Sequence, residues 1–161
     1  MRKPLETVSL VALAVLVFIS IRAIYGPARL PERIPTHFNA AGQPNGWGPS
    51  YMLLVFPAFA VAIYLLMSLV ARFPSAFNFP VRVTPYNRQR LEALALNMIA
   101  WLKAEIVVLF TVIEWSAIRA AHGPDHQFSP LLMPVALVAI FATCIAHTVA
   151  MFRAAPSAPQ R

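Results

Sequence analysis

The sequence predicts an all-α protein: a bundle of four transmembrane helices with a short structured extracytoplasmic loop between the first two. The first reason is composition, because 59% of the 161 residues are hydrophobic and only 12% are charged, about half the charged fraction of a typical soluble domain. The second reason is that the hydrophobic residues form long stretches, each near the ~20 residues that a helix needs to cross a bilayer. In a chain of this length, four spans leave only short connections and no room for a separate soluble catalytic domain. We therefore expect a membrane protein that is not an enzyme.

The four spans are expected at about residues 5–25, 51–71, 100–118 and 131–152. The first fits either a signal peptide or a retained anchor, and we expect an anchor because Pro27 stands inside the would-be cleavage site. In the second, Pro57 predicts a kink. The third contains three charged side chains, and we expect residues 91–99 to extend the same helix into the cytoplasm. Residues 1–153 should form one integral-membrane domain, followed by a disordered tail at 154–161.

The distribution of lysine and arginine predicts the orientation, because these residues collect on the cytoplasmic side. Eight lie on the side of the termini and of the loop 72–90, against three on the side of the loops 26–50 and 120–130. We therefore expect both termini in the cytoplasm. The net charge of +7 then reflects topology and does not indicate a nucleic-acid partner. The loop 72–90 also suits anionic lipid headgroups or an acidic partner protein, although the positive-inside bias already explains it.

The outer loop after the first span carries the most unusual residues of the chain. Asn45 and Gly46 predict a tight turn, because both tolerate positive φ. In an extended segment, Ile34, Thr36 and Phe38 would face the bundle while the intervening side chains face away. The loop should therefore be an ordered cap, with a tryptophan at the depth where indole rings prefer to lie. The contact candidates in this cap are Arg33, His37, Phe38, Asn39 and Trp47.

The same loop reads Leu30-Pro-x-x-Ile-Pro-Thr-His-Phe-Asn-x-x-Gly-x-Pro-x-x-Trp-Gly48, which resembles the signature of the DUF1648 family. Segments 84–90 and 101–105 are also similar to short members of that family. The family includes the N-terminal part of SdpI-type immunity proteins, bacterial membrane proteins that protect a producer cell from its own secreted toxic peptide. The immunity proteins have more spans than the four expected here. The resemblance therefore implies the fold of the membrane module more directly than it implies toxin protection.

Five ionisable residues lie within the expected spans, where each needs a partner or marks a pathway. They are Arg22, Lys103, Glu105, Glu114 and His147. Arg22 and Glu114 lie at similar depths, so we expect a structural pair, with extension of Arg22 to the outer surface as the alternative. Lys103 should extend into the cytoplasm. His147 should either bond a backbone carbonyl or interface water, or form a proton-linked pair with Glu105.

Three histidines fall on the outer side, at His37, His122 and His126. Histidine nitrogens are common zinc ligands, and a spacing of four places two of them on one helical face. Gly123 and Pro124 interrupt that helix, so we expect solvated loop histidines, no metal site and no other cofactor.

These residues predict a binding or protection module whose cap engages a peptide, a lipid or another membrane protein. An accessory subunit of a larger membrane complex is a related prediction. The alternative belongs to another class: a small proton- or ion-linked transporter that uses Glu105, Glu114, Lys103 and His147. The expected partners are the lipid bilayer and a peptide or membrane protein, and an oligomer is compatible with each prediction.

Overall fold

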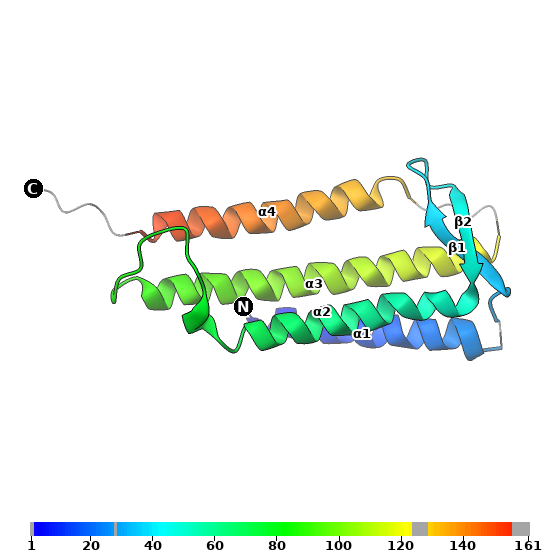
Figure 1. The fold of residues 1–161 in the computed structure, drawn as a ribbon, viewed down its shortest axis with the longest axis horizontal. Helices are drawn as coiled ribbons and strands as arrows, with labels where there is room; N and C mark the ends of the chain where they lie inside the picture. The colour runs from blue at the N-terminus through cyan, green and yellow to red at the C-terminus, as the bar shows by residue number, and fades with distance from the viewer. Residues whose placement is uncertain (1, 28, 124–128, 156–161) are drawn as a thin grey trace, which may run out of the picture.

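The computed structural model describes residues 2–27, 29–123 and 129–155. The described part contains four α-helices that run side by side (Figure 1). They are α1 (Arg2–Tyr25), α2 (Val55–Val70), α3 (Arg88–Ala121) and α4 (Leu132–Arg153). Each is long and apolar enough to cross a membrane, α2 together with the 3-10 turn η1 (Ser50–Leu54) before it. A short hairpin of β1 (Arg33–Phe38) and β2 (Pro44–Pro49), and a second 3-10 turn, η2 (Pro74–Ala76), complete the elements. The all-α, multi-pass fold is therefore confirmed.

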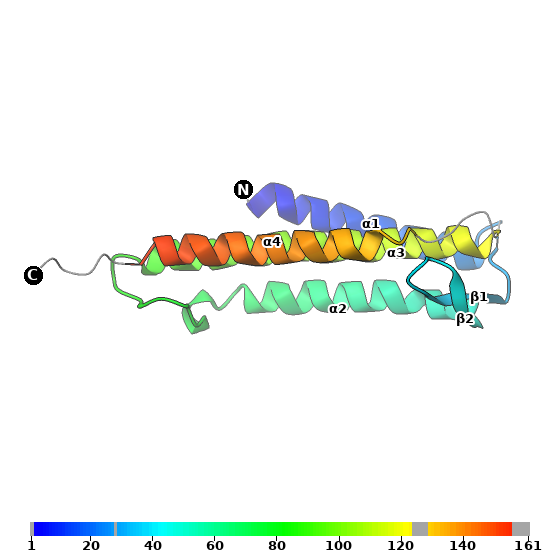
Figure 2. The same cartoon turned by 90° about the horizontal axis from the view of Figure 1, so that it is seen from above.

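Helix α3 is the centre of the bundle. Helices α1 and α2 pack against it and against each other, whereas α4 packs mainly on α3 from another side (Figures 1 and 2). In the most apolar 18-residue window of each helix, 6% of α4 is buried, against 22% of α1 and of α3. The arrangement is thus a three-helix group with α4 attached to its central member.

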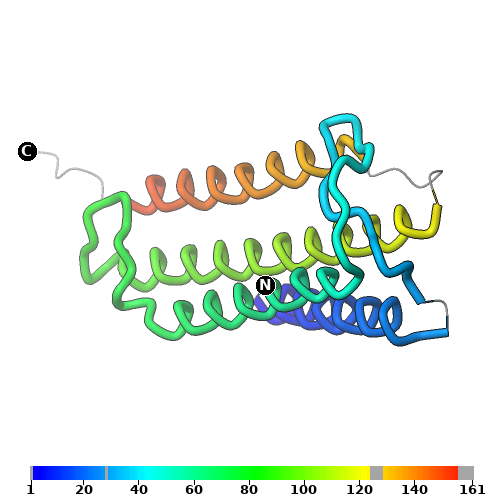
Figure 3. Tube along the Cα trace, turned by 45° about the vertical axis from the view of Figure 1, so that its right-hand side comes forward, coloured from blue at the N-terminus to red at the C-terminus, as the bar shows by residue number. Residues whose placement is uncertain are grey.

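The ends of the helices refine the expected spans. Pro57, expected to kink the second span, is the third residue of α2, where no backbone donor is needed, so it fits the first turn. Helix α3 is continuous over 34 residues, about 51 Å at 1.5 Å per residue and longer than the ~30 Å hydrocarbon core. Its first turns run beyond α1 (Figure 3). Residues 91–99 thus continue the same helix, as expected, and their place in the cytoplasm stays a prediction.

The cap consists of residues 33–49, and its turn lies elsewhere than expected. Asn39 accepts hydrogen bonds at its side-chain oxygen from two backbone amides of the turn, each at 3.0 Å, and Gly42 adopts a φ of 77°. The predicted Asn45-Gly46 turn is wrong, because both residues lie inside β2. Gly46 is needed for a different reason: a Cβ there would lie 2.9 Å from the Cβ of His37 on the opposite strand.

The predicted alternation along β1 is also interrupted. Ile34 and Pro35 are both buried, whereas Thr36 is exposed. The pairing with β2 shifts on both sides of His37, and such bulges change which face a strand residue presents. Ile34 packs into a core cluster with Ala23, Leu30, Leu53, Ala117 and Ile118. The cap is therefore fixed to one end of the bundle, which we call the cap end.

The opposite end, which we call the loop end, has its own core of Leu91, Ala95, Met151 and Ala154. Asn87 closes it by donating from Nδ2 to the carbonyl of Arg82 at 3.0 Å and to that of Ala154 at 3.3 Å. Ala154 is thus ordered and buried, which corrects the predicted start of the tail. Residues 156–161 lie outside the described residues.

Candidate functional site

A cavity of about 640 Å³ lies under the cap. Strand β1 forms one wall, and the starts of α2 and α4 form the others, with Met52, Phe56 and Met133 among the lining residues. Ile113 and Ala117 of α3 also line it. The lining is mostly apolar, and the volume is within the range of ~300–1,000 Å³ that is usual for small-ligand sites.

Three of the five predicted contact residues line this cavity: His37, Phe38 and Asn39. The expectation that the side chains of His37 and Asn39 face away from the bundle stays a prediction, because both residues line the cavity and both are exposed. Arg33 and Trp47 are not among the lining residues. Instead, Arg33 donates from Nη2 to the Trp47 carbonyl at 3.3 Å, which ties the two strands together.

The polar side chains of the cap are held in place by local hydrogen bonds. The Nδ1 atom of His37 contacts the side-chain oxygen of Asn45, so the ring is oriented by the neighbouring strand. Asn39 uses its oxygen in the hairpin turn. Among the described residues that line the cavity, His37 is the only titratable one. The site thus combines a mostly apolar lining with a few polar residues that are held by hydrogen bonds of the hairpin.

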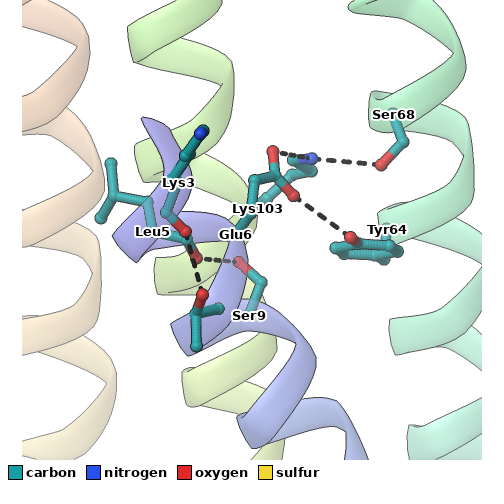
Figure 4. A network of polar contacts seen from close by, with 8 residues as sticks. Lys3, Leu5, Glu6, Ser9, Tyr64, Ser68 and Lys103 are labelled. Carbon is teal, nitrogen blue, oxygen red and sulfur yellow. Dashed lines mark hydrogen bonds and ion pairs between the residues drawn. The ribbon is translucent and has the colours of Figure 1, made fainter. Parts of the chain in front are cut away.

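Lys103 forms the most extensive polar cluster inside the bundle (Figure 4). Its Nζ lies 2.6 Å from Oε1 of Glu6 on α1 and 3.1 Å from the hydroxyl of Ser68 on α2. It also lies 4.7 Å from the ring centroid of Tyr64, whose hydroxyl donates to Oε2 of Glu6 at 3.1 Å. Lys103 is 3% exposed, so the predicted extension into the cytoplasm is wrong. Side chains from two neighbouring helices, α1 and α2, thus satisfy its charge.

Glu114 forms the second cluster, and its predicted pairing with Arg22 is wrong. Its Oε1 lies 2.5 Å from the hydroxyl of Ser20 on α1, and both residues are fully buried. Arg22 is exposed, and its extension to the outer surface, the alternative, stays a prediction. The physical reason is rotation: Ser20 faces α3, whereas the side chain two residues later points about 200° around the helix from it.

The third cluster lies between α3 and α4. The hydroxyl of Thr143 donates to Oε1 of Glu105 at 2.5 Å, and Nδ1 of His147 contacts the carbonyl of Thr143 at 2.9 Å. His147 therefore follows the simpler prediction, a bond to a backbone carbonyl. The second oxygens of Glu105 and Glu114 are buried without a hydrogen-bond partner among the described residues.

The outer histidines do not assemble a metal centre in the described part of the chain. No group of three or more histidine, cysteine, aspartate or glutamate side chains comes together there. His37 contacts Asn45, and Nδ1 of His122 lies 2.7 Å from the carbonyl of Ile118. His126 lies outside the described residues.

Sequence reasoning missed the partners of the buried charges: Glu6, Ser20, Tyr64, Ser68 and Thr143. One signal was available, because Tyr64 and Ser68 are four residues apart and so share one helical face. Such a pair of polar side chains in an apolar span points to a neighbouring polar group. The identity of that group depends on how α1, α2 and α3 are rotated, which the sequence pattern alone does not give.

Comparisons with known proteins agree with the loop motif. Residues 10–61 match the family model described as "Domain of unknown function (DUF1648)". An "Uncharacterized protein" of Archaeoglobus fulgidus is 39% identical over an alignment that covers 33% of each chain, so the aligned part of this chain corresponds to about a third of that relative. No solved structure matches. The predicted resemblance is therefore confirmed for residues 10–61, the DUF1648 segment of this chain, which supplies most of α1, the cap and the start of α2.

Proposed function

We propose that this protein is a non-enzymatic membrane module that binds an amphipathic polypeptide segment in the cavity at its cap end. The cavity under β1 carries the proposal, because its lining is mostly apolar and also includes His37 and Asn39. A membrane-active peptide or a span of a partner protein offers the matching combination of apolar side chains and backbone polar groups. The absence of a second titratable group from the described lining favours binding over catalysis.

Two physiological forms of this binding follow from the sequence. Protection against a membrane-active peptide is the form that the resemblance to SdpI-type proteins implies. In the second form, the protein is an accessory subunit of a larger membrane complex. In both, we place the cap on the outer face of a bacterial inner membrane and both termini in the cytoplasm. The concentration of basic residues in the termini and in the loop between α2 and α3 supports this orientation.

Site-specific photocrosslinking in native membranes tests the binding. A photoreactive amino acid replaces Met133, which lines the cavity, or Val138, which is on the same helix and 68% exposed. We expect position 133 to crosslink to a peptide or protein that position 138 does not reach. Equal crosslinking from both positions, or to lipid alone, would contradict the proposal. Recovery of a lone 17.8 kDa species from native membranes in mild detergent would contradict the accessory-subunit form.

Survival measurements test the protective form. A deletion strain is complemented with the wild-type protein, with Met133→Trp, which fills the cavity, or with Val138→Trp as the matched control. The cells are exposed to membrane-active peptides secreted by the same organism, and dye leakage is measured. We expect the wild-type protein and Val138→Trp to reduce leakage and Met133→Trp to lose that effect. Equal leakage in the deletion strain and the wild-type strain would contradict the proposal that the protein is protective.

The transporter alternative has weaker support. Lys103 and Glu114 are eleven residues apart, about 16 Å along α3, and each is bonded to a different part of the bundle. Glu105 bonds α4 instead. The three clusters thus do not form a continuous polar path through hydrogen bonds among the described residues. A flux assay in liposomes with the wild-type protein, Glu105→Gln and Glu114→Gln would test it, and flux lost in either variant would favour it.

A further inference from the structure

A carboxyl group is buried between α1 and α3 near the cap end. Glu114 is 0% exposed, and it lies one helical turn before Ala117 and Ile118, which belong to the same core cluster as Ile34 of the cap. Its Oε1 contacts the hydroxyl of Ser20 on α1 at 2.5 Å, and its Oε2 has no hydrogen-bond partner among the described residues. An ionised carboxyl group in such an apolar position is costly unless a cation or several donors accompany it.

No cation accompanies Glu114 in the described part of the chain. The ion pairs there involve Arg88 and Lys103, and Lys103 lies about 16 Å away along α3. Tyr64 of α2 contacts the Lys103 cluster instead. The other described titratable side chains at the cap end are all exposed: Arg22, Tyr25, Arg29, Glu32, Arg33, His37, Tyr51, Arg119 and His122. Those of α4 lie in its loop-end half: Cys144, His147 and Arg153.

The hydroxyl of Ser20 has one proton and two close acceptors. Its Oγ lies 2.7 Å from the carbonyl oxygen of Leu16 and 2.5 Å from Oε1 of Glu114. A carbonyl can only accept a hydrogen bond, and so can a carboxylate. An ionised Glu114 would therefore leave one of these two contacts without a hydrogen. A protonated Glu114 donates to Ser20, which donates to Leu16, so both contacts contain a hydrogen.

Other hydroxyl groups of the bundle support this assignment. Ser9 and Ser116 each donate to the carbonyl four residues earlier in the same helix, at 2.9 and 2.8 Å (Figure 4 shows Ser9). Ser20 makes the same bond to its own helix. The hydroxyl of Thr143 differs, because among the described residues it bonds Glu105 and no carbonyl of α4. Thr143 thus has a proton for Glu105, whereas the proton of Ser20 is already used.

We propose that Glu114 is a proton-binding site: at neutral pH its carboxyl group keeps a proton, which it donates to Ser20. When this proton leaves for solvent, an unpaired negative charge remains between α1 and α3. The Ser20 hydroxyl can then bond the carboxylate only by releasing the Leu16 carbonyl, so the contact between the two helices is weakened. This site does not depend on the binding proposed for the cap-end cavity.

Infrared spectroscopy of the whole chain in lipid bilayers at neutral pH tests the proton directly. Glutamate is labelled with ¹³C in its side-chain carboxyl group, because the carbonyl stretch of a protonated acid is separate from the bands of carboxylates. We expect a protonated-acid band that shifts with the label, is lost in Glu114→Gln and remains in Glu105→Gln. The absence of this band from the wild-type protein, or its persistence in Glu114→Gln, would overturn the proposal.

Unfolding in mixed detergent micelles tests the effect on the fold. The folded chain binds a proton at Glu114 that the unfolded chain releases, so a rise in pH favours unfolding. The side-chain amide of Glu114→Gln keeps a donor for Ser20 and does not titrate, so this variant should be at least as stable as the wild type at neutral pH. As the pH rises from about 5, the unfolding constant of the wild type should increase by up to about tenfold per pH unit relative to that of the variant.

Glu105→Gln is the matched control and should keep the wild-type dependence on pH. A Glu114→Gln variant that is less stable than the wild type at neutral pH, or that shares its pH dependence, would contradict a bound proton at Glu114.

Discussion

The two sides of α3 are built differently. Toward α1 and α2, it buries Lys103 and Glu114 and satisfies both with side chains of the neighbouring helices. Toward α4, it presents Glu105, which is only partly buried and accepts from Thr143. In lipid, apolar contacts between helices gain little over contacts with acyl chains, so polar contacts fix which helices associate and how. The comparison indicates that α1, α2 and α3 form a fixed unit and that α4 is the more easily displaced helix.

Removing the charged partner of Lys103 should lower the free energy of unfolding more than any of the other substitutions described below. Glu6→Gln leaves a charge that is 3% exposed without a counter-charge, and the free energy of unfolding should fall by about 3 kcal/mol. Unfolding in mixed detergent micelles measures it. Glu32→Gln, at an exposed acid before the cap, is the control and should change stability by less than about 0.5 kcal/mol.

The double variant Glu6→Gln, Lys103→Met sharpens this result. It removes both charges, so part of the lost stability should return relative to Glu6→Gln alone. Additive losses would show that the pair contributes nothing to the fixed unit, and the comparison between the two sides of α3 would lose its main support.

Ser20→Ala should have the next largest effect. It leaves Glu114 without its side-chain partner in a fully buried position, at a cost of about 2 kcal/mol in the same unfolding measurement. Ser9→Ala is a close control, because Ser9 is equally buried on the same helix and, among the described residues, its hydroxyl bonds the carbonyl of Leu5 and no side chain. Similar losses for both variants would mean that the contact with Glu114 adds no stability.

Thr143→Val should have the smallest effect. It removes the hydroxyl that donates to Glu105 and keeps the shape of the side chain, so we expect a loss of about 1 kcal/mol. The change should appear as easier separation of α4, measured by protease cleavage between α3 and α4, with Thr148→Val as the control on the same helix. If the double variant with Glu6→Gln showed more than additive loss, α4 would belong to the same cooperative unit as the other helices.

The sequence predicted that the cap is an ordered loop, but it did not predict the position of the turn or the register of the two strands. The motif from Leu30 to Gly48 identified an ordered loop and its family resemblance, since both depend on local residue types. The turn was misplaced because Asn39 and Gly42 compete with Asn45 and Gly46 for the same role, and the packing of Ile34 on α3 selects the register. The register shifts on both sides of His37 then interrupt the alternation along β1, which a period-two pattern does not anticipate.

The sequence by itself determined where the long apolar helices lie and where the chain carries its basic residues, because lipid selects for uninterrupted apolar length and the positive-inside bias acts on local charge. Only the tertiary structure decided the partners of the buried charges and the shape of the cavity under the cap. Those depend on the rotation and offset of each helix about α3. On α1, two residues or about 200° around the axis separate Ser20, which contacts Glu114, from the exposed Arg22.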